Sequence, residues 1–362
     1  MYKYNKNAEN LNSYKIPSTK NFKYKLDIGE WNFPIHETVI NEASNITNNE
    51  LSLYNVYDEQ FEELIKLIKL YNHLDIENPD YNVIVTNGSD NSLRLILDLF
   101  ATDKSKFLIP VPSYYHFECM LNTFKIKHLE KLYIDYKLDN NNIFILINNE
   151  LSNNYDLCYL VNPNMPIGYT LSNENIELLL INNPNTIFVI DEAYIEFSEC
   201  HSSATLIKKY NNLIIVKTFS KFFSLASLRI GYLISNNKII KLLDPYYNQK
   251  DVTKIAINCA YKSLQNISHY DKNKSEFLEI RSYIKNRLDK IIMNNSKIFE
   301  YILRDGMYFT LLTHNPRQLH EYFEKNNIAT RNKNDDIPGA IRITISRKEI
   351  MDEVFTILEK YT

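Results

Sequence analysis

The residues of this chain best suited to chemistry gather at the end of a short apolar run. Residues 213–216 are apolar and mostly β-branched, and Thr218, Ser220, Lys221 and then Arg229 follow them. A lysine amine held at the end of a buried strand can form a Schiff base with an aldehyde. Hydroxyls and a guanidinium bind phosphate well. An aldehyde and a phosphate together describe pyridoxal 5′-phosphate (PLP), although an isolated Ser-Lys pair is more often a plain surface feature.

Three further side chains could contact the ring of such a cofactor. Asp191 ends an apolar run in VIDEAYIEF, where a carboxylate can pair with a protonated pyridine nitrogen and keep the ring an electron sink. Tyr194, in the same motif, could bond the ring hydroxyl. Tyr114 follows an apolar run and a proline-marked turn, where an aromatic side chain could stack on the ring. Ordinary roles stay open, because Asp191 could cap a helix and any one of 27 tyrosines could simply pack.

Two motifs could bind anions. The segment NGSDN, which contains Gly88, Ser89 and Asp90, opens an expected helix. The free backbone N–H groups and the positive dipole end of that helix could seat a phosphate, although many turns share this composition. Near the C-terminus, Arg331 precedes Arg342, which lies inside an apolar strand. A guanidinium there needs an anionic partner, either a substrate carboxylate or an acidic side chain.

A sheet must bring these motifs together. Between residues 83 and 235, strand-like apolar runs alternate with helical patterns. This alternation predicts an α/β fold with a mostly parallel central sheet and helices on both faces. Ligands of such sheets lie at the carboxyl ends of the strands, where Gly88, residues 162–164, Asp191 and Lys221 all fall. The segment 140–149 is asparagine-rich at both ends and is expected at the surface around a short apolar run, 143–147.

The pattern changes after residue 245, where helices are followed by two strands and a last helix, which predicts a smaller α+β C-terminal domain. The expected division is an N-terminal arm over 1–35, a large domain over 36–245 and a small domain over 246–362. The chain has only six glycines, whereas average usage would give about 25. Glycine is therefore expected where a side chain would not fit.

Composition excludes several classes of protein. The 362 residues carry a net charge of −3, which gives no reason to expect nucleic acid or membrane as partners. Apolar runs are too short to span a bilayer, and the N-terminus lacks the apolar core of a signal peptide. The four cysteines are widely spaced and fit neither a disulfide framework nor a metal site. A cytoplasmic location and no bound metal are the resulting expectations.

Taken together, the motifs resemble one family. DEAYIEF (191–197) and TFSKFFSLASLRIGY (218–232), with GSD (88–90) and IRIT (341–344) in the same order, are similar to the motifs of fold-type I PLP-dependent aminotransferases. Within that class the chain resembles the histidinol-phosphate aminotransferase group. The resemblance runs from about residue 26 to the C-terminus.

The resemblance implies a role for each matched residue. Lys221 would hold PLP as an aldimine and shuttle protons, while Asp191 would bind the pyridine nitrogen and Tyr194 the ring oxygen. The other expected cofactor contacts are the phosphate seat, a stacking tyrosine, a turn amide and a tyrosine that reaches the neighbouring subunit of a dimer: Gly88, Ser89, Asp90, Thr218, Ser220 and Arg229; Tyr114; Asn164; and Tyr54. The expected substrate-binding residues are Arg342 for a carboxylate, Arg331 for a phosphate, and Gly29 of the N-terminal arm.

The chain departs from the family pattern at three places. The usual NPNNPTG turn reads NPNMPIG at 162–168, so Met165 replaces an asparagine that would touch the ring oxygen. Either Asn164 takes over that contact through a shifted loop, or Tyr194 makes it alone. Asn91 replaces an acidic residue, and the arm reads GEWNFP, which is closer to general class I aminotransferases.

The expected function is that of a PLP-dependent aminotransferase acting on a phosphorylated or otherwise anionic amino compound. It would use a keto-acid acceptor, ping-pong kinetics through the Lys221 aldimine, and a homodimer. Two alternatives stay open. The same scaffold serves PLP-dependent amino-acid-phosphate decarboxylases, and Met165 is compatible with a PLP-binding protein that has lost catalysis.

Overall fold

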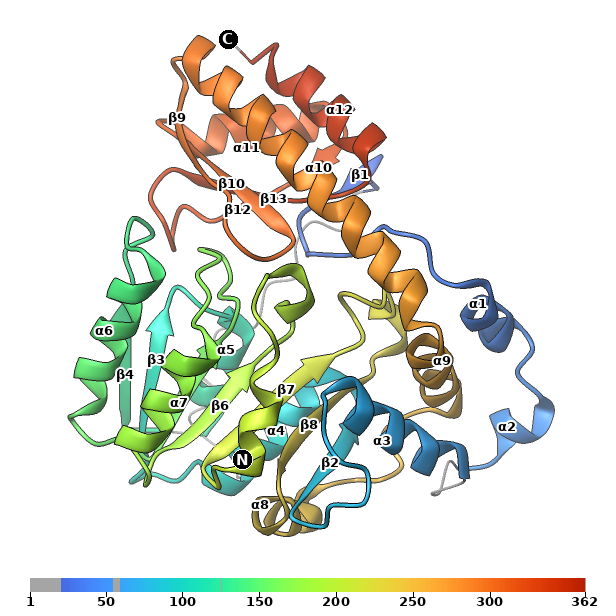
Figure 1. The fold of residues 1–362 in the computed structure, drawn as a ribbon. Helices are drawn as coiled ribbons and strands as arrows, with labels where there is room; N and C mark the ends of the chain where they lie inside the picture. The colour runs from blue at the N-terminus through green and yellow to red at the C-terminus, as the bar shows by residue number, and fades with distance from the viewer. Residues whose placement is uncertain (1–20, 55–58, 125, 362) are drawn as a thin grey trace, which may run out of the picture.

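The computed structural model describes residues 21–54, 59–124 and 126–361. A seven-stranded sheet forms its lower half, and the C-terminal elements lie above one edge of that sheet (Figure 1). The seven strands, in spatial order, are β2 (Tyr81–Thr86), β8 (Gly231–Asn236), β7 (Leu213–Thr218), β6 (Ile187–Asp191), β5 (Leu157–Val161), β3 (Lys106–Val111) and β4 (His128–Tyr133). Only β8 runs against the others among these strands, since it pairs antiparallel with both β2 and β7.

Helices cover both faces of this sheet. Strand side chains alternate between two apolar cores, so that in β5 Tyr159 belongs to one core and Cys158 and Leu160 to the other. The core with Tyr159 is covered by α4 (Gly88–Phe100), α5 (Tyr115–Thr123) and α8 (Asn237–Leu243). The opposite core is covered by α3 (Glu59–Tyr71), α6 (Asn140–Leu151) and α7 (Asn173–Asn182). The predicted α/β class, with a mostly parallel central sheet, is therefore confirmed.

The C-terminal part contains a second, smaller sheet. Its four antiparallel strands, in spatial order, are β12 (Arg331–Asn332), β13 (Ala340–Thr344), β10 (Tyr308–Thr313) and β9 (Ile298–Ile302). The helices of this part are α9 (Lys254–Gln265), α10 (Ile267–Asn294), α11 (Pro316–Lys325) and α12 (Lys348–Leu358). The long α10 runs from α9, near the large sheet, up to the smaller one (Figure 1). The predicted smaller α+β region is confirmed.

The N-terminal segment is joined to both halves. β1 (Tyr24–Lys25) pairs in parallel with β11 (Ile328–Ala329), and the Thr344 backbone N–H donates to the Leu26 carbonyl. α1 (Glu37–Ser44) and α3 then pack against α9, with the short α2 (Asn48–Ser52) beside them. The first twenty residues of the expected arm lie outside the described ranges. The division into an arm and two domains stays a prediction.

The segment 140–149, expected at the surface around a short apolar run, forms most of α6 (Asn140–Leu151). Asp139 caps this helix by accepting a hydrogen bond from the Asn142 backbone N–H, and Ile143 and Ile147 bury one face of it. Among the described residues, no helix is both long enough and apolar enough to cross a membrane.

Candidate active site

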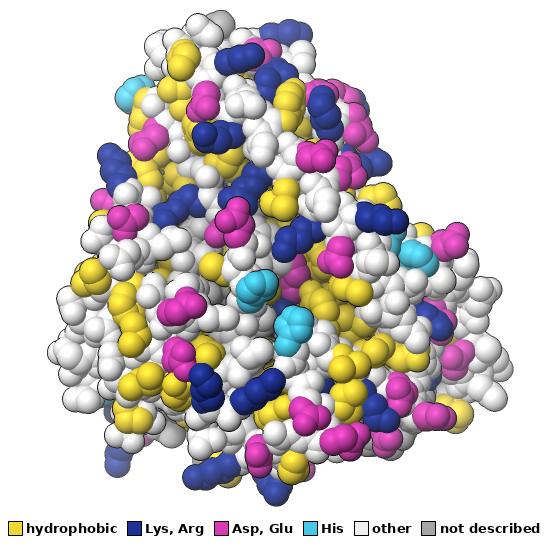
Figure 2. All heavy atoms as spheres, viewed as in Figure 1, with side chains coloured by type: hydrophobic (Ala, Val, Ile, Leu, Met, Phe, Trp, Pro, Cys, Tyr) yellow, Lys and Arg dark blue, Asp and Glu magenta, His cyan; other side chains and the backbone are white. Residues whose placement is uncertain are grey.

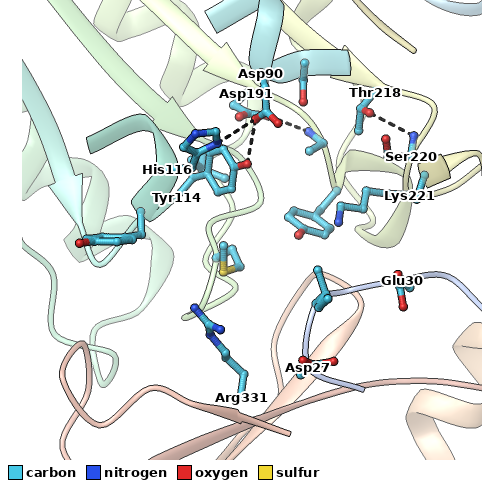
Figure 3. Close-up of a pocket in the computed structure, with 18 of the residues that line it drawn as sticks. Asp27, Glu30, Asp90, Tyr114, His116, Asp191, Thr218, Ser220, Lys221 and Arg331 are labelled. Atoms are coloured by element: carbon cyan, nitrogen blue, oxygen red, sulfur yellow. Dashed lines mark hydrogen bonds and ion pairs between the residues drawn. The ribbon is translucent and has the colours of Figure 1, made fainter. Parts of the chain in front are cut away.

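Most of the residues singled out from the sequence line one cavity of about 330 Å³. This cavity lies at the carboxyl ends of the strands of the large sheet, below the smaller sheet. Lys and Arg side chains gather around the hollow between the two halves (Figure 2). The predicted site residues that line the cavity are Ser89, Asp90, Tyr114, Asp191, Tyr194, Thr218, Ser220, Lys221, Arg229, Arg331 and Arg342. Most of them lie on or next to the large sheet, whereas Arg331 and Arg342 come from the smaller sheet (Figure 3). The cavity therefore has one end at the large sheet and one end at the C-terminal part of the chain.

At the end of the cavity next to the large sheet, the start of α4 and the side chains around Arg229 form a site suited to an anion. The start of β8 lies so close to the start of α4 that a Cβ on Gly231 would sit 2.6 Å from the backbone nitrogen of Ser89. Gly88 has φ +72°, and a Cβ there would sit 2.7 Å from Nη2 of Arg229. Arg229 Nη1 in turn donates to the Ser220 hydroxyl at 3.4 Å. The N-terminus of α4, the hydroxyls and a guanidinium thus converge where a phosphate could bind.

Asp90 is held by protein partners at the same place. Its carboxylate accepts hydrogen bonds from Tyr114 Oη at 2.8 Å and Arg229 Nη2 at 3.2 Å, and His116 lies 3.7 Å away (Figure 3). Burial alone would raise the pKa of Asp90, but the interactions with His116 and Tyr114 outweigh it and hold that pKa below its usual value. Its side chain therefore orients Tyr114 and Arg229 in the cavity. The sequence analysis missed His116.

A buried carboxylate lies in the cavity wall beside this anion seat. Asp191 is the last residue of β6 and is only 4% exposed. It accepts hydrogen bonds from Tyr159 Oη at 2.8 Å and from the Ala193 backbone N–H at 3.1 Å. Burial raises the pKa of Asp191 to about 6, although both hydrogen bonds act against the rise. A cationic partner in the cavity would relieve this cost.

The Lys221 amine faces the cavity between these groups and the N-terminal segment (Figure 3). Its Nζ donates to the Gly29 carbonyl at 3.0 Å and lies 5.6 Å from the centre of the Tyr194 ring. Gly29 has φ +75°, a conformation that strains residues with a side chain. Gly29 therefore contributes through its backbone, by positioning the amine.

The C-terminal end of the cavity is cationic. Arg331 on β12 lies directly opposite Arg342 on β13 in the antiparallel register, and both line the cavity. Arg342 is only 5% exposed and donates to Met165 Sδ at 2.8 Å and to the Asp27 carbonyl at 2.6 Å. Three further charged residues that the sequence analysis missed also line the cavity: Asp27, Glu30 and Lys333.

The turn at 162–168 places Met165, not Asn164, against the cavity. The Asn164 amide donates to the Pro112 carbonyl at 3.0 Å and its oxygen accepts from the Ile167 backbone N–H at 3.2 Å. Both ends of this side chain are thus bonded to backbone. Its predicted contact with a cofactor stays a prediction.

Tyr54 lies away from the cavity. It follows α2 and is 78% exposed, with Lys250 Nζ 5.0 Å from its ring centre. Its expected role involves a neighbouring subunit and stays a prediction.

These groups fit PLP. A buried carboxylate suits the protonated ring nitrogen, the seat around Arg229 suits the phosphate, and the lysine amine between them suits the aldehyde carbon. The residues that would hold the cofactor are Ser89, Tyr114, Asp191, Tyr194, Thr218, Ser220, Lys221 and Arg229. When bound, PLP would supply an electron sink for negative charge on a substrate carbon.

Several known proteins are similar to this chain in sequence and in fold. The chain is 30% identical over 372 residues to a dihydroxyacetone phosphate transaminase of Campylobacter jejuni, across 99% of this chain and 96% of that protein. It is 29% identical over 348 residues to a histidinol-phosphate aminotransferase of Clostridium botulinum, across 93% and 92%. The solved structure of a Sinorhizobium meliloti histidinol-phosphate aminotransferase in complex with PLP has the same fold, with a TM-score of 0.83 at 18% identity over 99% and 97% of the two chains.

The profile of one family, described as aminotransferase class I and II, matches residues 23–358. This match covers nearly the whole chain, including both sheets and every residue that lines the cavity. The chain therefore belongs to the class I and II aminotransferases, a family of PLP-dependent transaminases.

Proposed function

We propose that the amino compound on which this transaminase acts carries a phosphate. The observation behind this proposal is the direct pairing of Arg331 with Arg342 at the C-terminal end of the cavity. Like charges opposite each other on neighbouring strands are unfavourable, so their pairing is best explained by an anion that binds between or beside them. The names of the relatives agree, because the Campylobacter and Clostridium enzymes are named for phosphorylated compounds.

The chain's own groups would divide the work as follows. Lys221 lies in the cavity next to Tyr194, where its amine would take a proton from the substrate's Cα and return it. Asp191 would keep a proton on the ring nitrogen, since a buried carboxylate favours a cationic neighbour. Arg331 would bind the phosphate at the C-terminal end, and a keto acid would accept the amino group in the second half of a ping-pong cycle.

A homodimer with cytoplasmic location completes the proposal, by resemblance to the family. One surface feature supports the dimer. The end of α2 and the residues after it expose large apolar side chains, namely Leu51, Leu53 and Tyr54. These side chains would be covered by a second copy, which would bring Tyr54 to the partner's phosphate seat.

A half-reaction screen tests the substrate class. The holoenzyme would be mixed with histidinol phosphate or histidinol, and separately with dihydroxyacetone phosphate or dihydroxyacetone plus glutamate. The cofactor absorbance and the products would be followed by spectroscopy and mass spectrometry. We expect each phosphorylated compound to react at least about tenfold more efficiently than its partner, since one charge-assisted contact gives that much.

Two results would contradict the proposal. If the phosphorylated and unphosphorylated compounds reacted equally well, the proposal that the substrate carries a phosphate would be wrong. An amino-acid phosphate would be added as a further compound in the same screen, and release of carbon dioxide from it with no keto product would instead establish the decarboxylase alternative.

A further inference from the structure

A third cation joins the two arginines at the C-terminal end of the cavity. The Lys333 backbone N–H donates to the Ala340 carbonyl at 2.9 Å, so the ladder between β12 and β13 continues past Asn332. Side chains two residues apart on a strand share a face, which puts Lys333 on the face of Arg331. Lys333, Arg331 and Arg342 all line the cavity.

Lys333 is buried, unlike most lysines in ion pairs of this chain. It is 8% exposed and its Nζ donates to Asp336 Oδ2 at 2.6 Å. Burial lowers the pKa of Lys333 and the two arginines lower it further, while Asp336 acts in the opposite direction. A surface Lys–Asp pair would be screened by solvent, whereas this lysine lies in the wall of the cavity beside two like charges.

The three cations differ in how many donors they have left. Arg342 already bonds to Met165 and to the Asp27 carbonyl. Arg331 points into the cavity, and its guanidinium makes no hydrogen bond or ion pair with the described part of the chain (Figure 3). An ammonium has three N–H donors, so Lys333 keeps two after bonding to Asp336.

We propose that Lys333 is a specificity-determining residue that binds the substrate's phosphate together with Arg331, while Asp336 holds the lysine amine in position. A phosphate monoester carries nearly two negative charges at neutral pH, which matches two cations with free donors. A single carboxylate bound by Arg331 would leave the two remaining N–H donors of Lys333 without an acceptor. This proposal rests on the proposed function, because it names residues that would bind the phosphate of the proposed substrate.

Binding of an unreactive phosphate tests the proposal without requiring turnover. Glycerol 3-phosphate and inorganic phosphate would be titrated into wild-type holoenzyme and into Lys333→Met, Lys333→Arg and Lys348→Met, by calorimetry. Lys348 is the matched control, since it pairs with Asp352 on the exposed surface of α12. Lys333→Met should weaken glycerol 3-phosphate binding by about 10- to 150-fold, as expected for loss of a charge-assisted hydrogen bond. Lys333→Arg should keep most of the affinity, and Lys348→Met should keep all of it.

Kinetics separate a specific role from a structural one. Lys333→Met should lower kcat/KM for histidinol phosphate by the same factor and leave that for histidinol unchanged. Equal losses on both substrates, or wild-type affinity of Lys333→Met for glycerol 3-phosphate, would overturn the inference. If wild-type enzyme itself shows no preference for phosphorylated compounds, the proposed function fails. If wild type prefers them and Lys333→Met does so equally, only the role of Lys333 fails.

Discussion

The Tyr159 hydroxyl donates a 2.8 Å hydrogen bond to Oδ2 of Asp191, from the neighbouring strand of the large sheet. Both residues are buried, and Asp191 nevertheless has a pKa raised to about 6, because burial outweighs this bond. The carboxylate is therefore costly in the protein without its cofactor. A cationic ring nitrogen would turn that cost into binding energy.

This relationship predicts that Asp191→Asn stabilises the protein when the cofactor has been removed. The folded pKa of about 6 lies above the ordinary value of 3.8. The wild-type apoprotein should therefore lose stability as pH rises from about 4 to about 6. Asparagine does not titrate, so its advantage should be small near pH 4 and approach about 3 kcal/mol at pH 8, since each pKa unit corresponds to about 1.4 kcal/mol. Denaturant unfolding of both apoproteins at the two pH values measures it, and an equal difference at both would contradict it.

The same substitution should have the opposite effect on catalysis. Asparagine keeps the shape of the side chain and the contact with Tyr159 but removes the negative charge that would favour a proton on the ring nitrogen. We expect Asp191→Asn to lower kcat by at least about 100-fold, the size of active-site electrostatic effects. Tyr159→Phe is the milder control, which keeps the charge. A kcat for Asp191→Asn within about tenfold of wild type would contradict the assigned role.

The proposed attachment of the cofactor to Lys221 gives a chemical prediction. Borohydride treatment of the holoenzyme, followed by peptide mapping, should find the cofactor attached to Lys221, because this amine points into the cavity from the end of β7. Lys221→Ala should still bind PLP through the seat around Arg229 but should have negligible turnover. A label on another lysine would show that Lys221 is not the residue to which the cofactor is attached.

The chemistry at strand ends could be predicted from the sequence because it needs no knowledge of which strands are neighbours. Asp191 and Lys221 each follow an apolar run closely, and the carboxyl ends of parallel strands meet at one edge. Tyr159 could not be found in this way. It lies inside the apolar run LCYLV, where a tyrosine looks like core, and only the pairing of β5 with β6 brings it to Asp191.

Lys333 was missed for a related reason. It lies in NKNDD, a polar stretch that is typical of an exposed loop, and only the register with β13 turns its side chain into the cavity. The helix α6 was missed because asparagines at its ends conceal the spacing of Ile143 and Ile147. Composition marks such segments as surface, while their burial depends on tertiary pairing that a single sequence does not reveal.

Met165 should prove to be a structural partner of Arg342. Its Sδ accepts a hydrogen bond from a guanidinium that is 5% exposed and whose Nε already lacks a partner among the described residues. Met165→Leu keeps the volume and removes the acceptor, so it should lower the free energy of unfolding by about 1–3 kcal/mol. Met165→Gln, which restores an acceptor, should lose less. Equal unfolding midpoints for wild type and Met165→Leu would show that this contact contributes nothing.

Arg331 gives the sharpest prediction about the substrate, since it projects into the cavity without a described partner, whereas Arg342 is committed to Met165 and the Asp27 carbonyl. Arg331→Ala should lower kcat/KM for a phosphorylated substrate by roughly 10- to 150-fold, the loss of one charge-assisted contact. The unphosphorylated analogue should react nearly as in wild type, because it has no group at that end of the cavity. Arg331→Lys keeps the charge and should recover part of the loss. Equal losses on both analogues would mean that Arg331 shapes the cavity and does not read the phosphate.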